Sequence, residues 1–159
     1  MRARATCHIL RLLLLSYCCL MLSCQPSDDI ETIFSTHGWN FTGFCYTPNW
    51  DSADCSLLDI TLSGFETHQL NTIQFLANGI VEIDMPGCSA TGKWAADGIK
   101  RTFVIDNLRI TAGSLETLSP FSRKFYDELC KSAWYRGDST YLQLFDSEGH
   151  YYLLFAPKP

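Results

Sequence analysis

Eight cysteines are the residues of this 159-residue chain whose chemistry is most informative. A cysteine can bind a metal ion, act as a nucleophile, form a disulfide or be modified covalently. Structural zinc sites need closely spaced ligands, and the chain contains neither a C-x2-C nor an H-x3-H spacing. Eight cysteines are also many for a protein of the reducing cytosol. The sequence therefore favours an oxidising compartment and predicts no metal site and no cofactor.

Residues 1–23 have the composition of a secretory signal peptide. Three arginines occur before residue 12, the stretch 12–22 is apolar, and the first acidic residue is Asp28. A basic start followed by a short apolar stretch is typical of a signal peptide. A bilayer span would need roughly 20 apolar residues. The alternatives are a single-pass anchor and a buried helix.

The residues before Cys24 resemble a bacterial lipobox. Ordinary signal peptidase needs small residues at positions −1 and −3, and Met21 is too large for a cut after Ser23. The stretch 20–24 instead has the order of a lipobox, which accepts a large apolar residue at −3 and needs a small one before the cysteine. The resemblance implies that Cys24 becomes the lipidated first residue of the mature chain.

Residues 24–35 are predicted to form the lipidated cysteine and a tether. Gln25 after the cysteine implies export to the outer membrane, and Asp28 and Asp29 resemble the surface-export signal of Bacteroidota lipoproteins. We expect a lipid-anchored outer-membrane protein that faces the periplasm or the cell surface. The competing interpretation is a eukaryotic secreted protein, which only the glycosylation sequon at Asn40 supports.

Removal of residues 1–23 takes away three arginines and no acid. It leaves 136 residues with 9 basic and 17 acidic side chains, a net charge of −8. Such an acidic domain is poorly suited to nucleic acid. At 47% hydrophobic residues the chain is also too apolar to be disordered. We expect one folded domain over residues 36–159.

Four cysteines remain in this domain, and they allow three disulfide pairings. We predict Cys45–Cys55 and Cys88–Cys130. In the chain-entropy model the first, short loop stabilises the fold by roughly 2–3 kcal/mol, and the second, longer loop by about 4 kcal/mol.

The pattern of apolar runs and turn residues in the domain predicts mostly antiparallel strands. Asn78-Gly79 lies between apolar runs and predicts a type I′ hairpin, and Asp97-Gly98 marks a second hairpin. Gly149 is expected to supply the left-handed residue of a third. The predicted strands are an aromatic one opening at Trp39, then 57–62, 71–77, 80–84, 91–95, 102–105, 108–111, 141–145 and 151–155.

One helix is predicted to begin at Ser119-Pro120, because serine caps helices and proline suits the first helical position. Phe121, Phe125 and Leu129 recur every four residues and predict a face that packs on a sheet. A helical turn over 30–34 leads into the domain. The fold class is therefore α+β, mostly antiparallel β, barrel-like or strongly curved, with one helix packed on it.

The order of these elements resembles the small, uncharacterised lipoproteins of Bacteroidota with a lipocalin-like or META-like domain. The likeness rests on Trp39, on Gly-Cys-Ser at 87–89, on Gly-Lys-Trp at 92–94, on the helix 121–129 and on the hairpin after 141. META-type domains commonly carry Gly-Cys-Asn where this chain has Ser89. The resemblance implies no catalytic residues.

The loop 46–55 is the best candidate for ligand binding. It carries Tyr46, Asn49, Trp50 and Asp51, and the Cys45–Cys55 bridge would hold it rigid. Aromatic side chains on a rigid loop suit a glycan, a peptide or a protein. The alternatives are that Trp50 is buried and that the acidic residues are merely solvated or bind calcium weakly.

We expect a non-enzymatic lipoprotein of the cell envelope that binds a ligand or partner or has a structural role. Its partners would be the membrane and a small ligand, a glycan or a protein. The alternative is a surface hydrolase or an inhibitor with an unrecognised site. A hydrolase would bring His37, His68 or His150 close to a carboxylate or a serine in a cleft.

Overall fold

The computed structural model of the protein describes residues 28–48, 56–57 and 71–159. In chain order the elements are η1 (Glu31–Ser35, a π-helical turn), β1 (Trp39–Tyr46), β2 (Ser56–Leu57), β3 (Thr72–Phe75), β4 (Ile80–Met85), β5 (Cys88–Asp97), β6 (Thr102–Gly113), η2 (Leu115–Thr117, a 3₁₀ turn), α2 (Pro120–Leu129), β7 (Trp134–Gly137), β8 (Leu142–Phe145) and β9 (Tyr151–Pro157).

Eight antiparallel strands form a closed barrel. The sheet runs β1-β3-β4-β5-β6-β7-β8-β9, and β9 pairs with β1 to close it, while the short β2 pairs with the other edge of β1. This arrangement confirms the mostly antiparallel, barrel-like prediction with one helix. Among the described residues, no helix is long and apolar enough to cross a membrane.

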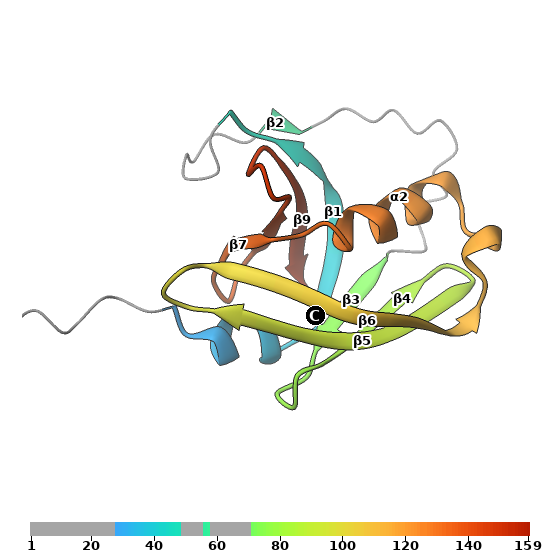
Figure 1. Ribbon diagram of the computed structural model, residues 1–159, viewed down its shortest axis with the longest axis horizontal. Coiled ribbons are helices and arrows are strands. Elements are labelled where there is room, and N and C mark those ends of the chain that lie inside the picture. Colours follow the sequence, from blue (N-terminus) through green and yellow to red (C-terminus); the bar gives the residue numbers. More distant parts are fainter. Residues whose placement is uncertain (1–27, 49–55, 58–70) are drawn as a thin grey trace, which may run out of the picture.

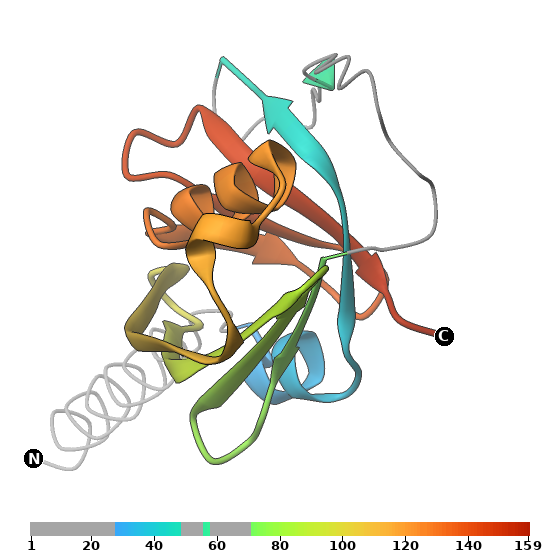
Figure 2. The ribbon, with the colours of Figure 1, turned by 90° about the vertical axis from the view of Figure 1, so that its right-hand side faces the viewer.

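The barrel wall is narrowly joined in two places. β1 meets β3 through only two residue pairs, and β6 meets β7 through only one, Thr102 with Trp134. β6 therefore diverges from β7 along most of its length, and α2 lies across the opening (Figure 1). Figure 2 shows α2 and the β8–β9 turn at one end of the barrel, and η1 and the β3–β4 turn at the other. We call these the helix end and the η1 end.

Aromatic side chains fill the η1 end. Phe34 is fully buried, although it lies in the segment that the sequence assigned to the tether. Its ring centroid lies 5.0–5.5 Å from those of four aromatic side chains: Phe75, Trp94, Phe103 and Tyr135. An eight-stranded barrel is just wide enough for side chains to fill it, and η1 supplies the last of them here.

The helix end is filled from α2. Phe41 of β1 contacts Phe121 at 5.4 Å and Phe125 at 4.8 Å between ring centroids. Phe125 and Leu129 are fully buried, which confirms the predicted apolar helix face. The N-terminus also forms as expected, because the Ser119 hydroxyl accepts from the Ser122 amide at 3.1 Å, with Pro120 at the first position.

One buried polar contact ties α2 to the wall. The Ser122 hydroxyl donates to the side-chain oxygen of Asn71 at 2.9 Å, just before β3 begins, and both residues are buried. The contact lies beside the narrow β1–β3 junction, since the Asn71 carbonyl accepts from the Phe41 amide at 2.9 Å. The helix thus supports the barrel where the strands hold it least.

Two details of the predicted strands are wrong. The β3–β4 hairpin forms, but only Gly79 has a positive φ, 78°. A type I′ turn needs positive φ at two residues; here four residues link the strands, and Leu76 pairs with Ile80. The two strands predicted over 102–111 are one strand, β6, which continues through an irregularity in its pairing with β5 between Asp106 and Arg109, where Asn107 adopts φ 56°. Gly149 has φ 74°, as expected.

We expect Phe34→Ala to destabilise the barrel by about 3–5 kcal/mol, since it removes the ring at the centre of the η1 end. Urea unfolding followed by tryptophan fluorescence measures this. The control is Ile99→Ala, at a side chain that is 60% exposed, which should change the stability by less than about 0.5 kcal/mol. Equal effects of the two substitutions would contradict the packing described.

Candidate functional site

A cleft of about 420 Å³ opens at the helix end, between α2 and the β8–β9 turn. Its floor is formed by side chains of β1, β8 and β9, among them Phe44, Leu144 and Tyr152. Its walls are charged. α2 contributes Lys124 and Glu128, the segment just after it contributes Lys131, and the turn contributes Asp146, Ser147 and Glu148. The cleft therefore combines an apolar floor with polar walls, which is the usual composition of a small-molecule site.

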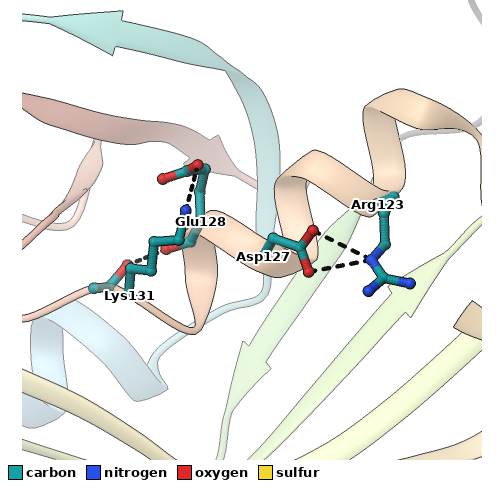
Figure 3. Close-up of polar contacts among 5 residues, drawn as sticks. Arg123, Asp127, Glu128 and Lys131 are labelled. Atoms are coloured by element: carbon teal, nitrogen blue, oxygen red, sulfur yellow. Dashed lines mark hydrogen bonds and ion pairs between the residues drawn. The ribbon is translucent and has the colours of Figure 1, made fainter.

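The helix wall carries an ordered row of charges. The Lys131 ammonium lies 3.0 Å from the Glu128 carboxylate, and this hydrogen bond raises the pKa of Lys131 above its ordinary value (Figure 3). Arg123 and Asp127 pair at 3.1 Å on the same helix but are not among the residues that line the cleft. Exposed pairs of this kind contribute little to stability. The Glu128–Lys131 pair holds its two charges beside the cleft.

Lys124 differs from the other charged groups of this wall. Its ammonium lies 4.6 Å from the centroid of the Phe44 ring, directly over the floor of the cleft. A cation over an aromatic face is attracted by the ring quadrupole. The contact keeps a positive charge against an apolar surface, where it can meet an anionic or polar group of a ligand.

The opposite wall is held rigid by its own hydrogen bonds. The Asp146 carboxylate accepts from the amides of His150 at 3.0 Å and Tyr151 at 3.4 Å, so it closes the β8–β9 turn. The indole of Trp134 donates to the Ser147 carbonyl at 3.3 Å. This wall is thus positioned before any ligand arrives.

An aromatic shelf, which we define as Tyr46, His150 and Tyr151, borders the cleft. Tyr46 and Tyr151 face each other across β1 and β9 with ring centroids 5.2 Å apart, and they are 36% and 49% exposed. The His150 ring lies 6.1 Å from Tyr46, and its Nδ1 is 3.2 Å from the Thr47 carbonyl oxygen. Exposed aromatic faces on two paired strands offer a stacking surface.

Of the four residues predicted to bind a ligand, the structure places Tyr46 on this shelf. Asn49, Trp50 and Asp51 lie outside the described residues, as does the lipidation residue Cys24. Tyr46 is therefore brought together with Tyr151, while the role predicted for the other three stays a prediction.

The cysteines are placed only in part. Cys45 is buried beside Phe145 and Tyr152 and borders the cleft, but Cys55 lies outside the described residues. Cys88 opens β5 and Cys130 follows α2; both are free thiols, so the disulfide predicted between them is absent from the structure.

The Tyr126 side chain lies near both of these thiols. Its pKa is raised chiefly by burial and further by Cys130 and Cys88. The two sulfur atoms thus share a neighbour on α2 without being bonded to each other.

The two histidines of the domain that the structure describes lie at opposite ends of the barrel. The His37 ring lies 4.5 Å from the Trp39 ring at the η1 end, tilted by 57°, and the His150 ring faces a backbone carbonyl. His68 lies outside the described residues. In the described part of the chain, no three His, Cys, Asp or Glu side chains are grouped as metal ligands. The Arg-Gly-Asp triplet at 136–138 ends β7, where the Asp138 side chain accepts from the Thr140 amide and closes a turn.

The sequence did not indicate the charged walls of the cleft. From the sequence we assigned no role to Lys124, Glu128 and Lys131 of the helix, and none to Asp146. Lys124, Glu128 and Lys131 are spaced by four and three residues, which places them on one helical face. This spacing is the sequence pattern that could have indicated the helix wall. That the β8–β9 turn lies opposite this face depends on barrel closure, which no local pattern encodes.

Comparisons with known proteins agree on one family. A family model described as "Domain of unknown function (DUF4847)" matches residues 25–157. A crystal structure of a DUF4847 family protein from Bacteroides vulgatus superposes with a TM-score of 0.67 at 25% identity, covering 80% of this chain and 96% of that one. A search of curated proteins gave no match.

We expect the Cys130 thiol to react slowly although the residue is exposed. Burial of the sulfur raises its pKa, and the Asp127 carboxylate raises it further. A raised pKa leaves less thiolate at neutral pH, so alkylation of the reduced protein by iodoacetamide should become fast only well above the ordinary thiol pKa of about 8.5. Peptide mass spectrometry of timed samples measures the rate at this cysteine.

Asp127→Asn should accelerate the reaction severalfold at pH 7.5, whereas Glu116→Gln, on the separate η2 turn, should leave it unchanged. A rate equal to that of a free cysteine peptide would contradict the assigned environment of the thiol.

Proposed function

The chain belongs to the DUF4847 family, and from this premise we propose that it is an exported, non-enzymatic lipoprotein that binds a ligand in the cleft at the helix end. The observation that carries the proposal is the cleft itself, about 420 Å³ with an apolar floor and rigid walls. A cleft of this size can enclose a small molecule or one to two residues of a longer chain.

A binding role fits the chemistry of the cleft better than catalysis. Hydrolysis by a nucleophile needs a base within hydrogen-bond reach of it. Among the described residues, the His150 ring contacts a carbonyl oxygen, and Asp146 is engaged by backbone amides. Both groups are therefore engaged in building the wall of the cleft.

The ligand class follows from the surfaces beside the cleft. Exposed rings at Tyr46 and Tyr151 suit the flat face of a sugar or a peptide side chain, and Lys124 suits a carboxylate or hydroxyl next to it. We infer a polar ligand with one apolar face, such as a short glycan or peptide.

The anchor and the family likeness complete the proposal. Cys24 carries the lipid, and the family match begins at residue 25, which supports a mature chain that starts at the cysteine. The protein would be held at the outer membrane, facing the periplasm or the surface. A sequential antiparallel barrel with one helix also supports kinship with lipocalin-like and META-like domains.

Ligand binding is tested with glycan and peptide arrays probed with the purified protein, followed by titration of each hit. We expect Tyr151→Ala to weaken binding by about 1–3 kcal/mol, roughly 5- to 150-fold in Kd, since a ring stacked on the ligand is lost. Val104→Ala is the matched control, because it also truncates a half-exposed side chain, but on β6. A hit that both variants bind as well as the parent would place its site elsewhere, and hydrolysis of the hit would refute a purely binding role.

Lipidation is tested with Cys24→Ala in cells that process lipoproteins. We expect the parent to fractionate with membranes and to carry a mature N-terminus with the mass of an acylated cysteine. The variant should lose both properties, because one attachment residue holds every acyl chain. Ser27→Ala serves as a control that leaves the lipobox intact. Unchanged processing and location of the Cys24 variant would contradict the anchor.

A further inference from the structure

The end of the tether is locked to the β5–β6 turn at the η1 end. The Asp28 amide donates to the Gly98 carbonyl at 3.0 Å. The Asp28 carboxylate accepts from Arg101 Nε at 3.1 Å and from the Tyr135 hydroxyl at 3.0 Å. Burial and this hydrogen bond raise the pKa of Tyr135, so the phenol stays protonated and remains a donor. The chain therefore enters the barrel at a fixed point.

The same turn presents an apolar side chain to solvent. Ile99 is 60% exposed, the highest value among the large hydrophobic residues of the described chain. The turn beneath it is rigid, because the Asp97 carboxylate accepts from the amides of Ile99 and Lys100, both at 2.9 Å. A polar residue at position 99 would remove no packing within the barrel, so the fold itself does not require an isoleucine at the tip of this turn.

Chain length sets how far this tip lies from the lipid. Cys24 precedes Asp28 by four residues, which span at most about 14 Å when extended. We propose that the β5–β6 turn is a membrane contact, with Ile99 entering the lipid headgroup region while the acylated Cys24 holds the barrel against the bilayer. This inference rests on the lipid anchor proposed above. It adds a defined orientation, with the η1 end toward the bilayer and the cleft away from it (Figure 2).

The charges around the turn favour a contact that is apolar rather than electrostatic. Arg101 pairs with Asp28 of the entering segment at 3.1 Å, and Lys100 lies close to the Asp97 carboxylate. Mixed signs give little net attraction to anionic lipid. The contact should therefore form on zwitterionic phosphatidylcholine and should change little with salt.

The test uses the full-length, lipidated protein reconstituted in phosphatidylcholine vesicles that contain nitroxide-labelled lipid. A fluorophore is attached at Ile99→Cys or, as the matched control, at Glu148→Cys in the turn of the helix end. Both variants carry Cys130→Ser to remove that thiol, and the protein without an engineered cysteine gives the background labelling. Acylation of every sample is verified by mass.

We expect several-fold stronger quenching at position 99 than at position 148, unchanged by added salt. Asp28→Ala should reduce the quenching at position 99 without altering the mass of the attached acyl chains, since it frees the tether from the turn. Acylated protein with equal quenching at both positions would overturn the membrane contact and leave the anchor standing. Protein without an acyl group would overturn both.

Discussion

The barrel depends on how its interior is filled at the places where its wall is thin. Backbone hydrogen bonds close most of the wall, but two residue pairs join β1 to β3 and one joins β6 to β7. Aromatic packing has to hold these junctions. Phe34 enters from η1 between β3, β5, β6 and β7, and Phe121 and Phe125 enter from α2 against β1. The two short elements outside the sheet are thus parts of its core.

This constraint decides where a ligand can bind. A barrel of eight strands has room either for side chains or for one small ligand. Here rings occupy both ends of the interior, and the accessible hollow opens at the helix end between α2 and the β8–β9 turn, against the core residues Phe44, Leu144 and Leu153. The helix therefore has two roles: its apolar face completes the core, and its charged face forms one wall of the cleft.

Features set by neighbouring residues could be predicted from the sequence, and features set by closure could not. The Ser119-Pro120 start of α2, its apolar face and the turn at Gly149 depend on residues a few positions apart. The predicted type I′ turn at Asn78 was wrong, because the number of residues in the loop depends on where the two strands end and not on the Asn-Gly pair alone. The candidate site was recognised only at Tyr46. Its partner Tyr151 is 105 positions away and becomes a neighbour through the β1–β9 pairing.

The entry point of the chain and the cleft lie at opposite ends of the barrel. Asp28 is fixed to the β5–β6 turn at the η1 end. At the helix end, the β8–β9 turn is held by the Asp146 carboxylate, and Glu128 pairs with Lys131 on the helix wall. If the proposed lipid anchor holds the chain at the η1 end, the contacts that shape the cleft lie at the far end of the barrel from that anchor. This separation would leave the cleft open to a ligand while the β5–β6 turn faces the bilayer.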